Sequence, residues 1–155
     1  MTTTAMTPRM ARTLPAEYRG KLMAIAREVT FPQGIRLFNE GGRADRFWII
    51  QSGTVALDMR VPGRRAAVIE TLGFGELVGW SWLFPPHVWQ LGAATVSPVR
   101  AFEFDAEAVR TMCRADRAMG SAVAHWVGRV MAHRLRATRT RLLDLYAPYG
   151  SGMPG

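Results

Sequence analysis

Two hydrophobic patterns divide the chain into three parts. Between Val29 and Asp105, short apolar runs are separated by glycines, and within a run apolar and polar residues alternate. This alternation is the period of half-buried β-strands, and its spacing predicts an antiparallel sandwich or roll. The predicted strand runs are Arg46–Ile50, Thr54–Arg60, Ala66–Leu72 and Val99–Phe104.

On either side of this region, apolar residues recur every three or four positions, which predicts helices. We expect a first helix over Pro15–Glu28, a short one over Ala106–Cys113 and a long one over about Met119–Tyr146. The long helix carries a heptad seam, which is typical of a packed or dimeric helix. The seam residues are Ala124, Gly128, Met131, Leu135, Thr138, Leu142 and Leu145.

The patterns predict one domain between two polar ends. Residues 1–14 are expected to form a flexible arm and residues 148–155 a disordered tail, because both lack periodicity. The domain between them covers 15–147, with the β-region at about 29–105 and the C-terminal helices at about 106–146. The predicted fold class is therefore mainly β with flanking helices.

Composition adds a basic charge to this picture. Twenty basic residues against 12 acidic ones give a net charge of +8, and all but Lys21 of the basic residues are arginine. Such a charge suits a polyanion, nucleic acid or an anionic membrane, but it also suits a merely soluble arginine-rich surface. The sequence contains no run of about 18 apolar residues, so we expect no membrane span. With no secretory signal and a single cysteine, we expect a cytoplasmic, bacterial protein without a disulfide.

Four segments in order carry a more specific signal. They are Phe31–Gly34, Leu37–Gly41, Phe47–Val55 and Gly73–Leu77. Together they resemble the cyclic nucleotide-binding domain of the CRP/FNR superfamily, over about residues 22–146. The run Gly79–Pro86 resembles a subset of small, stand-alone bacterial members. The resemblance implies an eight-stranded antiparallel β-roll, or jelly roll, with an N-terminal helix and two C-terminal helices.

The resemblance also implies a phosphate-binding cassette. In the family, turn amides hold the phosphate, a glutamate binds the ribose hydroxyl, and an arginine neutralises the phosphate. Gly75, Glu76 and Leu77 match the first half, but no basic residue stands between Trp89 and Ala94. Because a buried phosphate without a cation is costly, we expect weak or absent binding of cAMP and cGMP. The predicted residues of this degenerate site are Phe74, Gly75, Glu76, Leu77, Val78, Trp89, Gln90 and Leu91.

Two features leave alternatives open around this site. A more distant arginine, at Arg64, Arg65 or Arg100, could replace the missing one. The loop with Trp80, Trp82, Leu83 and Phe84 either fills the roll or forms a ligand site or a docking patch for another protein.

No catalytic or metal-binding set is visible. His125 and His133 are eight residues apart, whereas a helical metal pair needs a spacing of three or four. Cys113 lacks a partner motif and is expected to be a buried, inert thiol. We therefore expect no enzyme activity, no metal and no resident cofactor, with a cyclic nucleotide as the one ligand the family suggests.

The long helix offers the remaining partner hypotheses. Its arginines read as a solvated face beside the seam, although phosphate contacts are the alternative; they are Arg129, Arg134, Arg136, Arg139 and Arg141. Direct DNA binding is not expected, because the chain has no room for a helix-turn-helix after this helix. The leading hypothesis is a ligand-sensing regulatory domain with a degenerate cassette. The alternative is a protein-interaction module that uses the Trp-rich loop and the last helix, including a homodimer through that helix.

Overall fold

In the described residues, eight antiparallel strands in two four-stranded sheets form a roll with two helices at one end and a third along one side. The computed structural model describes residues 14–63 and 65–146, so the predicted arm and tail lie outside it except for Leu14. The sheet orders are β1-β8-β3-β6 and β2-β7-β4-β5. The elements are α2 (Ala16–Ala24), β1 (Arg27–Phe31), β2 (Arg36–Phe38), β3 (Arg46–Ser52), β4 (Val55–Met59), β5 (Ala67–Leu72), β6 (Leu77–Val78), the 3-10 helix η2 (Ser81–Leu83), β7 (Gly92–Thr95), β8 (Val99–Asp105), α3 (Ala106–Ala115) and α4 (Arg117–Tyr146).

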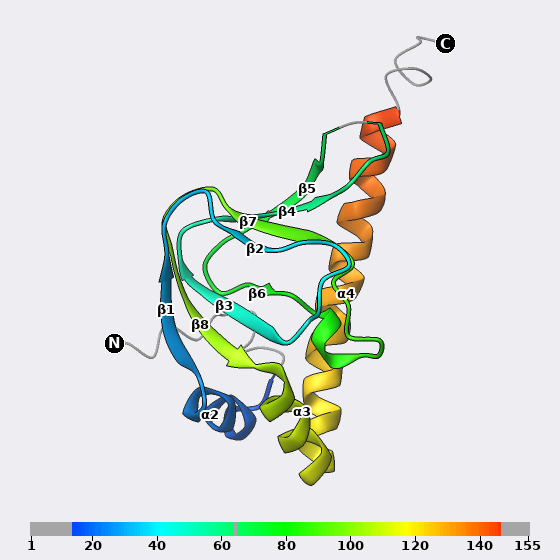
Figure 1. The fold of residues 1–155 in the computed structure, drawn as a ribbon. Helices are drawn as coiled ribbons and strands as arrows, with labels where there is room; N and C mark the ends of the chain where they lie inside the picture. Colours follow the sequence, from blue (N-terminus) through cyan, green and yellow to red (C-terminus); the bar gives the residue numbers. More distant parts are fainter. Residues whose placement is uncertain (1–13, 64, 147–155) are drawn as a thin grey trace.

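This architecture confirms the predicted fold class, and Figure 1 shows α4 running along one side of the roll. The C-terminal end of the first helix differs from the prediction. The helix predicted to reach Glu28 ends at Ala24, because Arg27–Phe31 pairs with β8 as an edge strand. Leu14, assigned to the flexible arm, is buried in the core.

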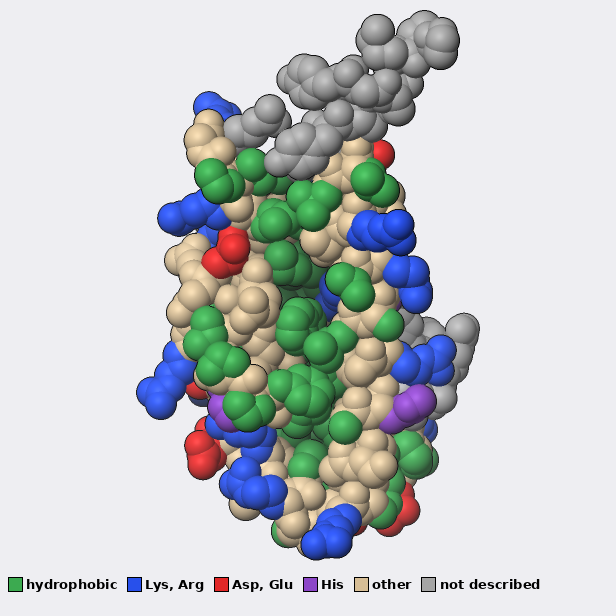
Figure 2. All heavy atoms as spheres, turned by 90° about the vertical axis from the view of Figure 1, so that its right-hand side faces the viewer, with side chains coloured by type: hydrophobic (Ala, Val, Ile, Leu, Met, Phe, Trp, Pro, Cys, Tyr) green, Lys and Arg blue, Asp and Glu red, His purple; other side chains and the backbone are tan. Residues whose placement is uncertain are grey.

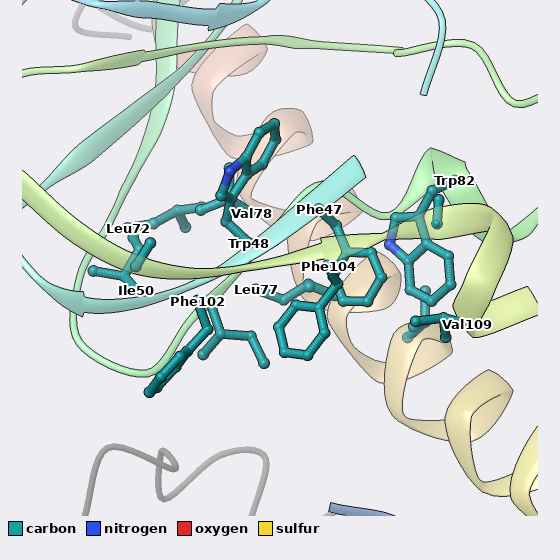
Figure 3. Packing of buried hydrophobic residues seen from close by; sticks show 14 of the residues in the cluster. Phe47, Trp48, Ile50, Leu72, Leu77, Val78, Trp82, Phe102, Phe104 and Val109 are labelled. Atoms are coloured by element: carbon teal, nitrogen blue, oxygen red, sulfur yellow. The ribbon is translucent and has the colours of Figure 1, made fainter. Parts of the chain in front are cut away.

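Aromatic rings fill the end of the roll beside α3. Phe47 on β3 stacks on Phe104 of β8 with ring centroids 4.7 Å apart, and on Trp82 of η2 at 4.0 Å. Figure 3 shows these rings lying together near Val109 of α3. Because the indole N–H of Trp82 also donates to Gly79 O (3.0 Å), this large side chain is buried with its polar group satisfied.

One strand departs from the expected alternation. Alternation along the run Val99–Phe104 places Glu103 on the face opposite Phe102 and Phe104, yet all three side chains are buried. Its carboxylate accepts hydrogen bonds from the indole N–H of Trp48 (3.0 Å) and from the guanidinium of Arg27. A buried carboxylate with two donors is stable where an unpaired one would not be.

The long helix turns a different face to the roll than the heptad seam predicts. Its buried residues are Met119, Val123, Trp126, Val127 and Arg134. The predicted seam lies beside this face, and within the described part of it Leu135 is 70% exposed. Leu145 belongs to the seam but its side chain is outside the described residues. The seam is only partly covered by the roll: Met131 packs against the core, whereas Ala124 and Leu135 are exposed.

Capping residues fix where the C-terminal helices begin. Asp105 accepts a hydrogen bond from the amide of Ala108 at the start of α3, which confirms the helix start expected there. Asp116 does the same for Met119 and also pairs with Lys21 of α2 at 3.2 Å. These contacts lower the pKa of Asp116, the amide of Met119 having the largest effect. In the part of the chain that the structure describes, no helix is long and apolar enough to span a membrane.

We predict that Glu103→Ala destabilises the fold by about 1–3 kcal/mol, because it leaves the buried indole N–H of Trp48 without an acceptor. Urea unfolding should show a lower midpoint with an unchanged slope. Glu28→Ala is the matched control, since this exposed glutamate on the neighbouring strand has only a 4.0 Å contact with Arg100. Equal shifts in the two variants would show that Glu103 is not structural.

A second prediction concerns Cys113, which is half-buried on α3. Burial raises the pKa of its thiol, Asp116 adds to the effect, and Arg114 opposes it. Because the thiolate is the nucleophile, Cys113 of the folded protein should react more slowly with a disulfide reagent at neutral pH than Cys113 of the unfolded chain. The stability that the raised pKa contributes is present below the ordinary thiol pKa and is lost as the pH rises through the folded value. Equal reaction rates in the folded and unfolded protein would contradict this prediction.

Candidate ligand pocket

The turn between β5 and β6 forms the half of the cassette that the sequence matches. Gly75 has φ = +87°, a conformation that favours glycine. Its N–H donates to Ile50 O (2.7 Å), and the N–H of Glu76 donates to Gly73 O (3.1 Å). The amide of Gly75 therefore holds the turn against β3 and the amide of Glu76 closes the turn on itself, whereas the resemblance assigns turn amides to a phosphate.

The other residues of the first half divide between surface and core. The phenyl ring of Phe74 is exposed, while Leu77 and Val78 are buried. Glu76 is half-buried, and one of its carboxylate oxygens lies 3.3 Å from the donor N–H of Gly73. Glu76 is thus the polar side chain of this half.

Trp89 lies against Phe38 of β2 and Gly79, the residue that follows β6. Its side chain is 5% exposed and stacks on Phe38 with centroids 3.8 Å apart and planes 12° from parallel. Gly79 faces the ring so closely that a Cβ there would stand 2.6 Å from two indole carbons, and its φ is +98°. The remaining cavity, lined by these residues together with Trp80 and Leu91, holds about 10 Å³. That is about the room a single water molecule needs.

Backbone hydrogen bonds hold Trp89 in place. Its N–H donates to Gly42 O and its carbonyl accepts from the N–H of Gly41, both at 2.9 Å. The neighbouring Gln90 is exposed and its side-chain amide donates to Val88 O (3.2 Å). Backbone hydrogen bonds therefore pair the loop after η2 with the loop between β2 and β3, and we call these two segments the zipped loops.

None of the described arginines considered from sequence reaches this cavity. Arg65 and Arg100 are exposed, Arg100 facing Glu28, and Arg64 lies outside the described residues. The arginine in the cavity wall is Arg134 of α4, which is 4% exposed. Its Nη2 donates to Leu77 O (2.9 Å), and its Nε lies 3.1 Å from Oε1 of Glu70.

The interpretation of the helix arginines as a solvated face is wrong for Arg134. The signal that could have revealed it is its spacing, because Arg134 follows Val127 and Val130 at seven and four residues, on the apolar stripe. Arg141 is half-buried and donates to Val68 O (2.9 Å). Arg129, Arg136 and Arg139 are exposed, as expected.

The Trp-rich loop is mainly a filling element. Trp82 is fully buried, Trp80 and Leu83 are half-buried, and Phe84 is 39% exposed. If this loop is a docking patch for another protein, the accessible aromatic side chain is therefore Phe84 and not Trp82.

The histidines stand apart from one another. His133 pairs with Glu70 (2.9 Å) on the flank of α4, His125 is exposed, and His87 has φ = +58° in the loop after η2. Within residues 14–63 and 65–146, no three His, Cys, Asp or Glu side chains gather as metal ligands would.

Comparison with known proteins agrees with the fold. The model of the cyclic nucleotide-binding domain matches residues 28–116. The chain is 36% identical over 117 residues to a CRP-like cAMP-activated global transcriptional regulator of Mycobacterium tuberculosis, which covers 76% of this chain. The match covers 50% of the regulator, so the chain spans about half the length of this curated relative.

Solved structures show the same architecture. A cyclic nucleotide-binding domain from Methylobacillus flagellatus superposes with a TM-score of 0.72 at 17% identity, covering 90% of this chain and 74% of that one. The N-terminal domain of a transcriptional regulator from Streptomyces coelicolor gives 0.67 at 25% identity, covering 83% and 91%. The matched family model and the fold agree: this chain belongs to the cyclic nucleotide-binding domain family of the CRP/FNR superfamily.

Proposed function

We propose that the chain is a regulatory, non-enzymatic domain whose cyclic nucleotide pocket is filled by its own Trp89. The observation that carries the proposal is the stack of Trp89 on Phe38 beneath Gly79, which leaves about 10 Å³. A cyclic nucleotide needs far more space than one water molecule. Binding of cAMP or cGMP is therefore weak or absent, and the role involves neither a chemical step nor a resident cofactor. We propose that the protein is located in the cytoplasm.

Displacing Trp89 has a large energetic cost. Removing a buried aromatic side chain from a core costs about 3–5 kcal/mol. If a nucleotide has to expel Trp89 before it binds, a cost of that size weakens the apparent affinity by more than about 100-fold.

Charge adds to this cost. A cyclic nucleotide carries a phosphate monoanion, and the arginine of the cavity wall, Arg134, is already 3.1 Å from the carboxylate of Glu70. Drawing Arg134 toward a phosphate would leave Glu70, whose side chain is 16% exposed, with a weaker counter-charge. Among the described residues, the arginine that lines the cavity is thus already paired, so the cassette is short of positive charge as well as of space.

A second role, a homodimer through α4, is supported by two exposed leucines on this helix. Leu135, which belongs to the seam, is 70% exposed, and Leu143, which lies next to the seam, is 59% exposed. Figure 2 looks onto the side of the molecule that bears α4 and shows a band of hydrophobic side chains flanked by Lys and Arg. Covering such a band is favourable, so a second copy or another protein is the partner class we propose for α4.

The first prediction of this proposal is that neither cAMP nor cGMP gives saturable heat in calorimetry at up to about 1 mM. Trp89→Ala should bind cAMP more tightly than the wild-type chain, because it opens the pocket. Adding Glu76→Gln to Trp89→Ala should remove that gain, since Glu76 is the polar side chain of the cassette turn.

Thermal unfolding of each variant is the control for folding. Micromolar binding by the wild-type chain would contradict the filled pocket. A folded Trp89→Ala variant that binds no better than wild type would show that Trp89 is not what closes the site.

The second prediction concerns the dimer. Leu135→Glu should shift sedimentation at micromolar concentration from dimer to monomer, because it puts a charge into the seam. Thr140→Glu is the matched control: Thr140 is also exposed on α4, but five residues on, it faces another direction. A monomeric wild-type chain, or equal effects of both substitutions, would rule out this interface.

A further inference from the structure

A second and much larger hollow lies at the end of the roll, away from the filled pocket. It measures about 900 Å³ and is lined by five segments: the start of β1, the loop before β3, the loop after η2, the end of β8 and the first turns of α3. Figure 1 shows α2 and α3 at this same end, where β8 finishes. We call it the end groove. Nothing in the cassette takes part in it.

The lining of the end groove holds four arginines and four carboxylates, so these side chains carry no net charge. The kind of ligand that the groove can bind therefore depends on which of these groups already have partners. Glu103 is buried, and both of its oxygens accept hydrogen bonds, from Arg27 and Trp48. Asp105 caps α3 through the amide of Ala108, and the side chain of Glu107 lies 3.5 Å from Arg110. The acceptors are therefore largely committed.

The donors of the end groove are far less committed. Among the residues that the structure describes, the exposed side chain of Arg43 makes no hydrogen bond or ion pair. Arg46 is 3.8 Å from Glu103, beyond normal hydrogen-bond length, and its side chain is 56% exposed. Arg27 reaches Glu103 through one nitrogen, and its side chain is 71% exposed. Since each guanidinium has five N–H donors, the groove offers open donors from three arginines, with Asp45 as the open carboxylate.

The wall of the end groove is also the support of Trp89. Arg43 bridges to Val88 across the two zipped loops, and the N–H of Ala44 donates to His87 O at 2.8 Å. Arg43, His87 and Val88 line the groove, whereas the next residue, Trp89, fills the pocket on the other side. His87 adopts a positive φ of 58°, an unusual backbone conformation for a residue with a side chain.

We propose that the end groove is a binding site for a small organic anion, one carrying a carboxylate or a phosphate group. Arg43 and Arg46 bind the anionic group, because planar guanidinium donors match both kinds of oxyanion. Asp45 favours a ligand that also bears a hydroxyl or amine donor. The end groove shares no lining residue with the cassette, so this proposal does not depend on the proposal that Trp89 fills the pocket.

The test uses the full chain labelled with ¹⁵N and four probes: glucose 6-phosphate, malate, and the neutral glucose and malamide. Amide shifts are followed up to about 10 mM, which detects a Kd of about 1 mM. We expect saturable shifts for at least one anion, centred on residues 43–46 and 86–88, and none for its neutral counterpart. The phosphate and carboxylate arms distinguish which oxyanion the groove prefers.

Variants decide whether the arginines act as proposed. Arg43→Gln combined with Arg46→Gln should weaken the anion's binding by at least about tenfold. Arg136→Gln is the control for loss of positive charge, since Arg136 is exposed on α4 and absent from the groove lining. No saturable shift with either anion, shifts centred on Gly75 and Glu76, or equal weakening in the control would each overturn the proposal.

Discussion

The packing of Trp89 on Phe38 is the contact on which the state of the pocket depends. It joins the loop after η2 to β2, and Gly79 must lack a side chain for the indole to lie where it does. The two hydrogen bonds between Trp89 and the Gly41–Gly42 turn fix the same residue through its backbone. The ring is held by the stack and the backbone by the hydrogen bonds, so both parts of Trp89 are fixed. The indole is therefore part of the folded core, which packs as densely as a crystal.

Arg134 gives α4 a comparable role on the other side of the cavity. Its guanidinium reaches Glu70 of β5 and the carbonyl of Leu77 on β6, so one side chain connects the helix to both sheets. Desolvation offsets much of the attraction in a buried ion pair of this kind, so the pair adds little net stability. The face of α4 that carries Arg134 meets the roll, whereas Leu135 faces outward. The burial of Arg134 and the exposure of Leu135 thus both follow from the orientation of α4.

The sequence predicts those parts of the fold that depend on local pattern. The strands from Arg46 to Leu72 follow from alternation and glycine turns, and the start of α3 follows from Asp105. It predicts that the cassette lacks its arginine, but it does not show that Trp89 is buried on Phe38. Glu103 and Arg134 are the clear misses, because a charged residue is buried only when distant partners meet it. Trp48 is 55 residues from Glu103, and Leu77 is 57 residues from Arg134. No local pattern contains such pairings.

The zipped loops connect the two hollows of the molecule. One face of this wall presents Arg43 and His87 to the end groove, and the other presents Trp89 to the closed pocket. A ligand can shift an equilibrium only by its difference in affinity for the two states. An anion held by Arg43 would have different affinities for the two states if the loop with Gly41 and Gly42 moved between them. Moving this loop would also release the hydrogen bonds of Trp89. Linkage is reciprocal, so opening of the Trp89 pocket would change the affinity of the groove by the same factor. If the cassette is filled as we propose, the domain can in this way still respond to a small molecule, from the opposite side of the same loop.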